Sequence, residues 1–533
     1  MEKYQILRKK YPKFIYRNYS YKISKVNEAK ASSPSSPAVA GSINNLEIFF
    51  DFRIEHFNKL ENLLKGDMNR RFIEPGICFT PKITVENIDE SQLKKLERGA
   101  LNNLVFHLGL AEIPSYWKAT CSPEIEIQAG FLNEKQIRWW KDLIIHGMGQ
   151  FFYENQIDFT SSNFLKIKSF RKTGLRNLSL KKLKNRILIP IGGGKDSIVT
   201  LEILKKVKKK INCFSLNPTQ ASKKIIKAAA FQTQALAKPK ELKFFLTRSN
   251  ELVREDERSS SPKPIIVRRK IDDKLLELNR KGFLNGHTPF SAYLAFLSIL
   301  CALIFDYKYM AFSNERSSNE GNIKYLKKAI NHQYSKSFNF EKKFRRYSQK
   351  YLTSGVEYFS FLRPLYEIQI AKLFSKYPRY FPIFLSCNEA YKTASGTKKP
   401  LKKWCGQCPK CLFVFTTLYP FLEIRKLIKI FRKNLFKDKK LISLMLQLIG
   451  EKKFKPFECI GTQKESLIAF YLSWEKDRVR TLAKPFPLLK YFQNKIIPKY
   501  PSLERESKKL INAWDNQNNL PNELRKTLKG EVN

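Results

Sequence analysis

The sequence predicts an α/β protein built around a doubly wound parallel sheet, with further segments before and after it. The first observation is an apolar run of strand length, residues 187–191, which leads through glycines 192–194 into a helical pattern over residues 198–210. The second is that strand-like and helix-like segments alternate from Asn185 onward, which is typical of parallel strands joined by helices. Together these observations predict a nucleotide-binding type of sheet.

The bulk composition indicates a globular protein with a large positive net charge. The chain has 533 residues, 43% of them hydrophobic, and a net charge of +51 from 99 Lys and Arg against 48 Asp and Glu. Such a charge favours nucleic acid, an anionic membrane surface or phosphorylated substrates. The lysines are also accompanied by many Ile, Asn, Phe and Tyr residues, as in proteins from A/T-rich coding sequences. A functional and a compositional origin of the charge both stay open.

No secretory signal opens the chain, because the first 21 residues have charge but no apolar core. The longest apolar run, residues 290–305, is shorter than the roughly 20 residues that a membrane span needs and predicts a buried helix. Nine cysteines, an odd number, do not suggest a disulfide framework. The sequence therefore predicts a cytoplasmic protein without a membrane span, and it sets no oligomeric state.

Two segments are predicted before the parallel sheet. Residues 1–44 are basic and then rich in Ser and Pro, which predicts a flexible tail and linker. Residues 45–184 predict an N-terminal α+β domain, in which the aromatic loop 113–123 either contacts substrate or packs internally. The predicted strands are residues 46–54 and 83–87, and the predicted helices are residues 90–109 and 136–155.

The parallel sheet is predicted within residues 185–386, with an active site beyond the carboxyl ends of its strands. Polar segments follow or cap apolar elements there, and they contain His287, Glu315, Arg316 and His332. The histidines could equally be structural, and Glu315 and Arg316 could form a surface pair. Besides residues 187–191, the predicted strands are residues 211–216, 243–246 and 307–313, and a helix is predicted through residues 228–237.

The glycine turn has the composition of an anion-binding loop. Glycines let phosphate oxygens approach the backbone N–H groups at the start of a helix. Asp196 could hold Mg²⁺ and Ser197 could bind a phosphate. The spacing fits neither a Walker A loop nor the dinucleotide fingerprint. It resembles the PP-loop of the ATP pyrophosphatases, Ser-Gly-Gly-x-Asp-Ser, with Gly192 in place of the serine. An ordinary glycine turn is the alternative.

A cysteine cluster predicts a metal site in residues 387–420, followed by a helical region over residues 421–533. Thiolates at this spacing, with a fourth upstream, can complete a tetrahedral Cys₄ site. A structural zinc ion is the first choice, and an iron–sulfur cluster or unrelated cysteines are the alternatives. Cys459 stands apart from this set and is typical of a small buried apolar residue. The predicted ligands are Cys387, Cys405, Cys408 and Cys411.

Several motifs taken together resemble the ATP-dependent epimerases of the MurL type, which act on UDP-N-acetylmuramoyl-L-alanyl-L-glutamate. The resemblance runs from about residue 45 to about residue 474. The motifs are GGGKDS (192–197), NGHTPFSA (285–292), SNERSS (313–318), NHQYSKSFNFE (331–341), CGQCPKC (405–411), KPFECIGT (455–462) and PSYWKATCSP (114–123).

This resemblance implies inversion of the terminal L-Glu to D-Glu in a peptidoglycan precursor, with ATP and Mg²⁺. It implies that Gly192, Gly193, Gly194 and Lys195 hold the pyrophosphate and that Asp196 holds the metal ion. Arg316 becomes a candidate clamp for a substrate carboxylate. The candidates for the acid and the base are His287, His332, Lys336 and Cys459, in no defined order.

Two other functions stay open. The cysteine knuckle is also similar to that of the deazaguanine nitrile synthases, so the chain could be a PP-loop enzyme that modifies tRNA or a nucleobase. The net charge would then serve RNA binding. A non-catalytic nucleic-acid-binding protein is the third possibility, and it would leave the glycine loop without a role.

Overall fold

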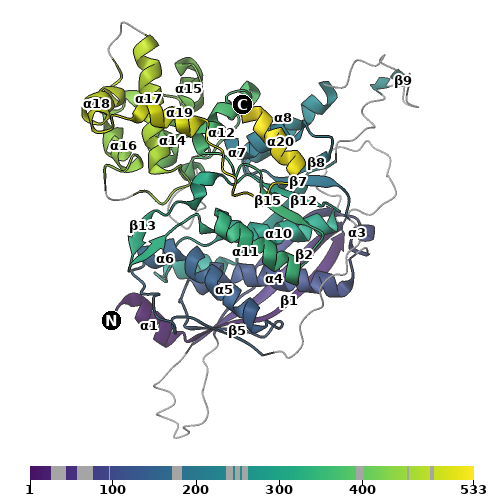
Figure 1. The fold of residues 1–533 in the computed structure, drawn as a ribbon. Helices are drawn as coiled ribbons and strands as arrows, with labels where there is room; N and C mark the ends of the chain where they lie inside the picture. The colour runs from purple at the N-terminus through teal and green to yellow at the C-terminus, as the bar shows by residue number, and fades with distance from the viewer. Residues whose placement is uncertain are drawn as a thin grey trace.

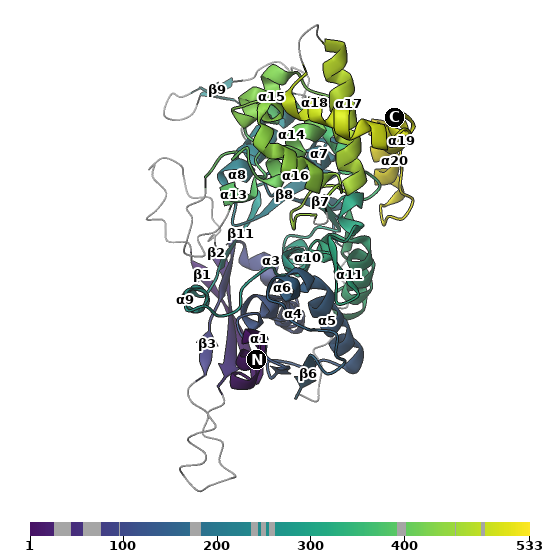
Figure 2. The same cartoon turned by 90° about the vertical axis from the view of Figure 1, so that its left-hand side faces the viewer.

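The chain folds around one large mixed sheet, with helices on both of its faces and a helical region at one end (Figures 1 and 2). The computed structural model describes residues 1–25, 44–56, 76–94, 96–170, 183–235, 244–246, 252–254, 262–391, 401–452, 455–480 and 485–532. The strands of the large sheet are β1 (Lys13–Lys25), β2 (Asn44–Glu55), β3 (Ile77–Phe79), β4 (Lys82–Ile88), β5 (Glu124–Ile127), β6 (Lys166–Ser169), β7 (Arg186–Pro190), β8 (Lys210–Leu216), β11 (Ile265–Lys270), β12 (Tyr309–Phe312) and β15 (Glu357–Ser360).

The strand order across the sheet is β15-β12-β7-β8-β11-β4-β2-β1-β5-β6, with β3 beside β2. Neighbouring strands are parallel from β15 to β11, as the alternation of elements in residues 185–386 predicts. From β11 through β4 and β2 to β1 the neighbours are antiparallel, and from β1 to β6 they are parallel again. The strands on both sides of the predicted boundary at residues 184/185 therefore belong to one sheet.

Alternating side chains place each parallel strand between two cores. In β7, Ile187 and Ile189 enter one core and Leu188 enters the other, because successive side chains of a strand point to opposite faces. β12 divides Met310 and Ala311 in the same way. Helices α4 (Arg98–Trp117) and α10 (Phe290–Ile304) lie on the Leu188 side, and α7 (Lys195–Leu204) and α12 (Glu367–Phe374) lie on the other.

The first 25 residues are structured, and the prediction of a flexible tail is wrong for them. Helix α1 (Lys3–Lys10) leads into β1, which pairs with β2 on one side and with β5 on the other. Phe14 and Tyr16 of β1 are completely buried. The basic composition hid this strand, because Arg17, Lys22 and Lys25 lie on its exposed positions. The predicted Ser/Pro linker lies outside the described residues.

Helices occur in both ranges where they are predicted between residues 90 and 155, but each predicted helix is divided into two and its boundaries differ. Residues 113–117 continue α4 instead of forming a loop, and the side chains of Tyr116 and Trp117 are completely buried. The aromatic residues of this segment therefore pack internally. The strands predicted at residues 46–54 and 83–87 are confirmed as β2 and β4. The other helices here are α3 (Glu90–Lys94), α5 (Glu134–Gly147) and α6 (Gly149–Glu154).

One strand of the parallel part is β11, which the sequence pattern misses. It pairs with β8, whereas β9 (Phe244–Leu246) has β10 (Leu252–Arg254) as its one strand partner among the residues that the structure describes. The strand predicted at residues 243–246 occurs as β9, but in the described structure it does not pair with the large sheet. The pattern misses β11 because its charged end, Arg268–Arg269–Lys270, hides its apolar start. The helices α8 (Gln220–Ala235) and α10 confirm the two predicted helices. No helix in the described part of the chain is long and apolar enough to cross a membrane.

The region beyond residue 387 is helical, as predicted, and its last helix packs back against α7 and α12. Its helices are α13 (Asn388–Tyr391), α14 (Pro409–Leu418), α15 (Ile424–Phe431), α16 (Ile442–Leu448), α17 (Gln463–Arg480), α18 (Pro487–Lys495), α19 (Leu503–Ile511) and α20 (Asn522–Val532). The remaining elements are α9 (Asp273–Arg280), α11 (Phe338–Tyr351), the hairpin of β13 (Ile323–Tyr325) and β14 (Lys328–Ile330), and the 3-10 turns η3 (Arg316–Asn319), η4 (Tyr334–Lys336), η5 (Pro378–Tyr380), η6 (Leu435–Lys437), η7 (Lys439–Leu441) and η8 (Ile497–Lys499).

Candidate active site

The glycine loop lies between the carboxyl end of β7 and the start of α7, as predicted. Gly193 has φ +107°, and a Cβ atom there would lie 3.2 Å from Tyr391 Oη. At Gly192 no atom of the described residues lies within 4 Å of such a Cβ, so this side of the loop is open in the described structure. The Ser197 hydroxyl donates to the Gly194 carbonyl at 3.0 Å. A tight turn with an open backbone face at a helix start can accept an anion.

Lys195 does not extend over the open face of this loop. Its side chain is almost completely buried, and its ammonium group donates to the carboxylates of Asp196 and Glu367. Burial lowers the pKa of Lys195, but these two carboxylates outweigh it and hold the pKa above its ordinary value. Lys195 is therefore a charged partner of the carboxylates, and its predicted contact with pyrophosphate stays a prediction.

Three carboxylates gather at this end of the sheet. Oxygen atoms of Asp196, Glu315 and Glu367 lie within 4.8 Å of one another. Asp196 is in the first turn of α7, Glu315 follows β12, and Glu367 begins α12. Burial and the negative charge of Glu367 raise the pKa of Glu315 to about 7. Burial raises the pKa of Asp196, but Lys195 and Lys410 outweigh it and lower that pKa overall.

The four candidates for the acid and the base lie together beside these carboxylates. Lys336 Nζ is 3.1 Å from Cys459 Sγ, and Cys459 Sγ is 3.9 Å from His332 Nε2. The ring centroids of His332 and His287 are 6.0 Å apart. The four candidates and the carboxylates also interact electrostatically, because the negative charges of Glu315 and Asp196 both raise the pKa of Lys336. Residues from three separate loops thus form one cluster of groups that can exchange protons.

His332 has a defined orientation within this cluster. Asn322 Oδ1 accepts hydrogen bonds from the backbone N–H of His332 at 3.2 Å and from its Nδ1 at 2.9 Å. The proton of the neutral ring therefore lies on Nδ1, and Nε2 faces the Cys459 thiol as an acceptor. In His287, Nδ1 is buried and has no hydrogen-bond partner among the described residues.

Positive charge surrounds both imidazole rings. Burial, with the charges of Lys336, Lys455 and Lys410, lowers the pKa of His332 to about 3. Burial, with His332 and then Lys336, lowers the pKa of His287 to about 3 as well. A field that disfavours a positive imidazole favours a bound anion, and a bound anion would raise both pKa values again. The cluster is thus suited to a substrate that bears or develops negative charge.

The four cysteines form the predicted cluster. Their sulfur atoms lie within 4.8 Å of one another, with 3.9 Å between Cys387 and Cys408 and 3.6 Å between Cys405 and Cys411. Tetrahedral coordination with metal–sulfur bonds of about 2.3 Å requires sulfur atoms about 3.8 Å apart. The backbone N–H of Cys408 also donates to Cys405 Sγ at 3.3 Å. Donor type and spacing therefore fit a four-coordinate metal ion such as zinc.

Comparison with known proteins agrees with this arrangement. Residues 49–250 and 235–361 match the MurL N-terminal domain, and residues 383–494 match the MurL C-terminal domain. A UDP-N-acetyl-alpha-D-muramoyl-L-alanyl-L-glutamate epimerase of Xanthomonas oryzae pv. oryzae is 31% identical over 370 residues, which cover 68% of this chain and 74% of that protein. The chain belongs to the MurL family. A Micromonospora protein with the same name is 31% identical over 366 residues, or 69% of this chain and 73% of that protein.

This MurL-family chain is an epimerase. The cysteine cluster positions one lysine of the candidate site. Lys410 lies between Cys408 and Cys411, at the start of α14. Its Nζ donates to the carbonyl of Cys459 and lies 3.8 Å from Glu367 Oε1. Its backbone N–H donates to Glu458 Oε2 at 2.8 Å. The fold of the cysteine knuckle thus positions the Lys410 ammonium group beside the carboxylates. Sequence reasoning missed Lys410, although its place inside the CGQCPKC motif is a usable signal.

Arg316 contacts residues outside the cluster, and its role as a carboxylate clamp stays a prediction. Its Nε is 3.4 Å from Asp515 Oδ2, and its guanidinium group lies over the Tyr366 ring at 4.5 Å. Arg363 occupies the inner position and is completely buried. It donates to the Glu315 carbonyl at 2.6 Å and also to the Lys336 carbonyl. A single charged residue inside the apolar run of residues 359–365 was the available signal.

Two further buried groups complete the surroundings. Glu465 Oε1 accepts from the backbone N–H of Glu367 at 2.6 Å, which fixes the start of α12. Lys118, just after α4, donates to the Gly286 carbonyl at 3.0 Å, next to His287. Burial lowers the pKa of Lys118 to about 8. The PSYWKATCSP segment therefore reaches the site through its lysine, while its aromatic residues pack in the core.

Proposed function

We propose that this chain inverts the terminal L-Glu of UDP-MurNAc-L-Ala-L-Glu to D-Glu, using ATP and Mg²⁺ and releasing AMP and pyrophosphate. The observation that supports this most is the cluster of His287, His332, Lys336 and Cys459 beside the carboxylates and the glycine loop. Membership of the MurL family supports the substrate, because the relatives are named for it. The reaction belongs to peptidoglycan precursor synthesis, which uses UDP-linked intermediates in the cytoplasm.

The need for ATP follows from the acidity of the substrate. An ionised carboxylate makes its own Cα–H very weakly acidic, because deprotonation would build a dianion. Attack of a carboxylate oxygen on the α-phosphorus of ATP forms an acyl-adenylate and releases pyrophosphate. The negative charge on the carboxyl group is then gone, and loss of the Cα proton gives an enolate-like species. Return of a proton to the other face, followed by hydrolysis, gives the D-residue and AMP.

The residues of the cluster would divide this work. One group must remove the Cα proton and another must return it from the opposite face. The thiol of Cys459, the imidazoles of His287 and His332 and the amine of Lys336 supply the candidates. Lys336 and Lys410 would stabilise the negative charge that develops on the carbonyl oxygen. Lys118 adds positive charge beside His287.

The carboxylates and the cysteines fit two metal ions with different roles. Asp196, Glu315 and Glu367 offer the oxygen ligands that Mg²⁺ prefers, and a bound Mg²⁺ neutralises phosphate charge. We propose a PP-loop type of nucleotide site there, with the backbone of residues 192–194 at the pyrophosphate. We propose that the four cysteines hold a structural Zn²⁺, because four thiolates leave no open coordination position for chemistry.

The decisive experiment is incubation of the purified protein with UDP-MurNAc-L-Ala-L-Glu, ATP and Mg²⁺ in D₂O, followed by chiral analysis of the glutamate. We expect D-Glu with deuterium at Cα only when both ATP and Mg²⁺ are present, together with AMP and pyrophosphate. Single replacements of His287, His332, Lys336 and Cys459 should block inversion, and some should leave exchange from one epimer intact. Absence of exchange, with AMP release that tRNA stimulates, would replace the epimerase by an RNA-modifying enzyme.

A further inference from the structure

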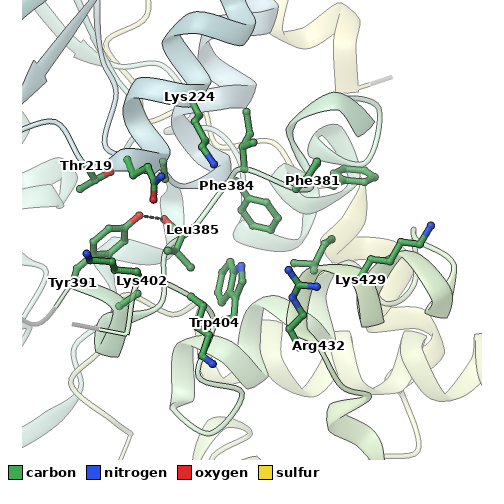
Figure 3. Close-up of a pocket in the computed structure, with 17 residues that line it drawn as sticks. Thr219, Lys224, Phe381, Phe384, Leu385, Tyr391, Lys402, Trp404, Lys429 and Arg432 are labelled. Carbon is green, nitrogen blue, oxygen red and sulfur yellow. Dashed lines mark hydrogen bonds between the residues drawn. The ribbon is translucent and has the colours of Figure 1, made fainter. Parts of the chain in front are cut away.

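A cavity of about 670 Å³ lies next to the glycine loop, between the start of α8 and the region of the cysteine knuckle (Figure 3). Its volume is within the range of small-molecule binding sites. Its wall touches the loop directly: the backbone N–H of Leu385, a lining residue, donates to the Gly193 carbonyl at 2.9 Å. A Cβ atom at Gly193 would lie 3.3 Å from Ala221 Cβ and 3.2 Å from Tyr391 Oη, and both of these residues also line the cavity.

One wall of the cavity is aromatic and held in place. The ring centroids of Trp404 and Phe384 are 5.2 Å apart, and those of Trp404 and Phe431 are 4.7 Å apart. Tyr391 is fixed by the hydrogen bond from its hydroxyl to the Leu385 carbonyl at 2.8 Å. Aromatic side chains that cannot move far offer a flat apolar surface to a planar ring at little entropic cost.

The rim of the cavity is basic. Of the residues that the structure describes, five cations line it and no Asp or Glu does. None of the five forms an ion pair with a carboxylate among the residues that the structure describes, although many other lysines of the chain do. In Figure 3 the side chains of Lys224 and Arg432 point toward the space above Trp404. The five cations are Lys224, Lys402, Lys403, Lys429 and Arg432.

Two features of the backbone add to this positive surface. The first turn of α8 lines the cavity, and Thr219 Oγ1 accepts from the Ser222 N–H at 3.1 Å just there. The N-terminus of this 16-residue helix carries partial positive charge, and its first turn is part of the cavity wall. Arg432 and Lys402 also adopt φ values of +69° and +54°, a conformation that usually favours glycine. The fold therefore tolerates backbone strain at two of the cations.

From these observations we infer that this cavity binds the nucleoside diphosphate end of a nucleotide. The aromatic wall would take the base, and the cations with the α8 N-terminus would take phosphate groups that continue toward Gly193. Two molecules of the proposed reaction have this chemistry: ATP, and the UDP-linked substrate. The inference rests on the proposed function for these two candidates, but the basic and aromatic lining is independent of the reaction.

The test is direct binding of nucleotides to the full chain by calorimetry, with no turnover required. The probes are α,β-methylene-ATP with Mg²⁺ and, separately, UDP and UDP-MurNAc-L-Ala-L-Glu. Lys224→Ala and Arg432→Gly remove cations that point into the cavity. Glycine at position 432 keeps the turn without strain, so a loss of binding there cannot come from a weakened fold. Arg425→Ala is the matched control for Arg432. It removes an exposed cation of α15, the helix that ends just before Arg432, and Arg425 does not line the cavity.

We expect each cavity variant to weaken one nucleotide by about tenfold or more, as for the loss of a charge-assisted contact, with the control unchanged. Weaker binding of the ATP analogue alone assigns the cavity to ATP, and weaker binding of the two uridine nucleotides alone assigns it to the substrate. Unchanged binding of every probe, or a wild-type chain that binds none of them, overturns the inference. Weaker nucleotide binding in a chain that forms no D-Glu would instead keep the cavity site and remove the epimerase reaction.

Discussion

Replacement of Glu315 by Gln tests the electrostatics of the carboxylate cluster. Glu315 is 5% exposed, and burial with the negative charge of Glu367 raises its pKa from 4.5 to about 7. A carboxyl group whose pKa is higher in the folded state than in the unfolded state stabilises the fold most when it is protonated. That contribution is complete below pH 4.5 and is lost as the pH rises through about 7.

The size of the effect follows from the pKa difference. At 1.36 kcal/mol per pKa unit, ionised Glu315 costs the folded state about 3 kcal/mol above pH 7. Glutamine has no charge and does not incur this cost. The unfolding entropy is about 2.1 cal/mol/K per residue, so for cooperative unfolding of 533 residues the gain corresponds to about 3 °C in Tm.

The assay is thermal unfolding of wild type and Glu315→Gln at pH 5 and pH 8.5, without nucleotide or metal. We expect the variant to melt about 3 °C higher at pH 8.5 and much closer to wild type at pH 5. Addition of α,β-methylene-ATP and Mg²⁺ at pH 8.5 should raise the Tm of wild type more than that of the variant, because an amide oxygen is a weaker Mg²⁺ ligand than a carboxylate. Glu357→Gln, at a partly exposed residue paired with Lys308, is the control for the loss of one carboxylate outside the cluster.

An equal Tm for wild type and Glu315→Gln at pH 8.5 would refute the reasoning. It would mean that the surrounding lysines already stabilise an ionised Glu315. An increase in Tm that is the same at pH 5 and pH 8.5 would also refute it, because the variant would then be stabilised by packing and not by the loss of charge.

Three other predictions address the loop, the metal site and the two arginines. Asp196→Asn should lower AMP release by about 100-fold with the fold intact, and a wild-type rate would exclude the loop from the reaction. Elemental analysis should find one zinc per chain, and Cys408→Ser should lose it and melt at a lower temperature; iron with a visible absorption band would assign a cluster instead. Arg363→Met leaves buried Glu341 without its ion-pair partner and should cost about 3–5 kcal/mol of stability. Arg316→Met, which removes a partly exposed pair, should cost at most about 1 kcal/mol, and equal losses would contradict the inner position of Arg363.

The local features of this chain could be predicted from its sequence. The strand, glycine turn and helix of residues 187–204 are consecutive, and their conformation follows from glycine's freedom and the apolar pattern. The cysteine spacing likewise predicts a knuckle, because three of the four cysteines lie within seven residues. Family motifs named the groups that could exchange protons. In each case the information lies within a few neighbouring residues.

The tertiary structure decided which of these groups meet. His287, His332 and Cys459 come from loops more than 40 residues apart, and only packing against the end of the sheet brings them together. It also placed Arg363 inside, with partners Glu315 and Glu341, and Arg316 at a partly exposed position beside Asp515. The strands β1 and β11 were missed for a similar reason. Strand partners are chosen by contacts between distant residues, and a basic composition masks the apolar alternation that would reveal them.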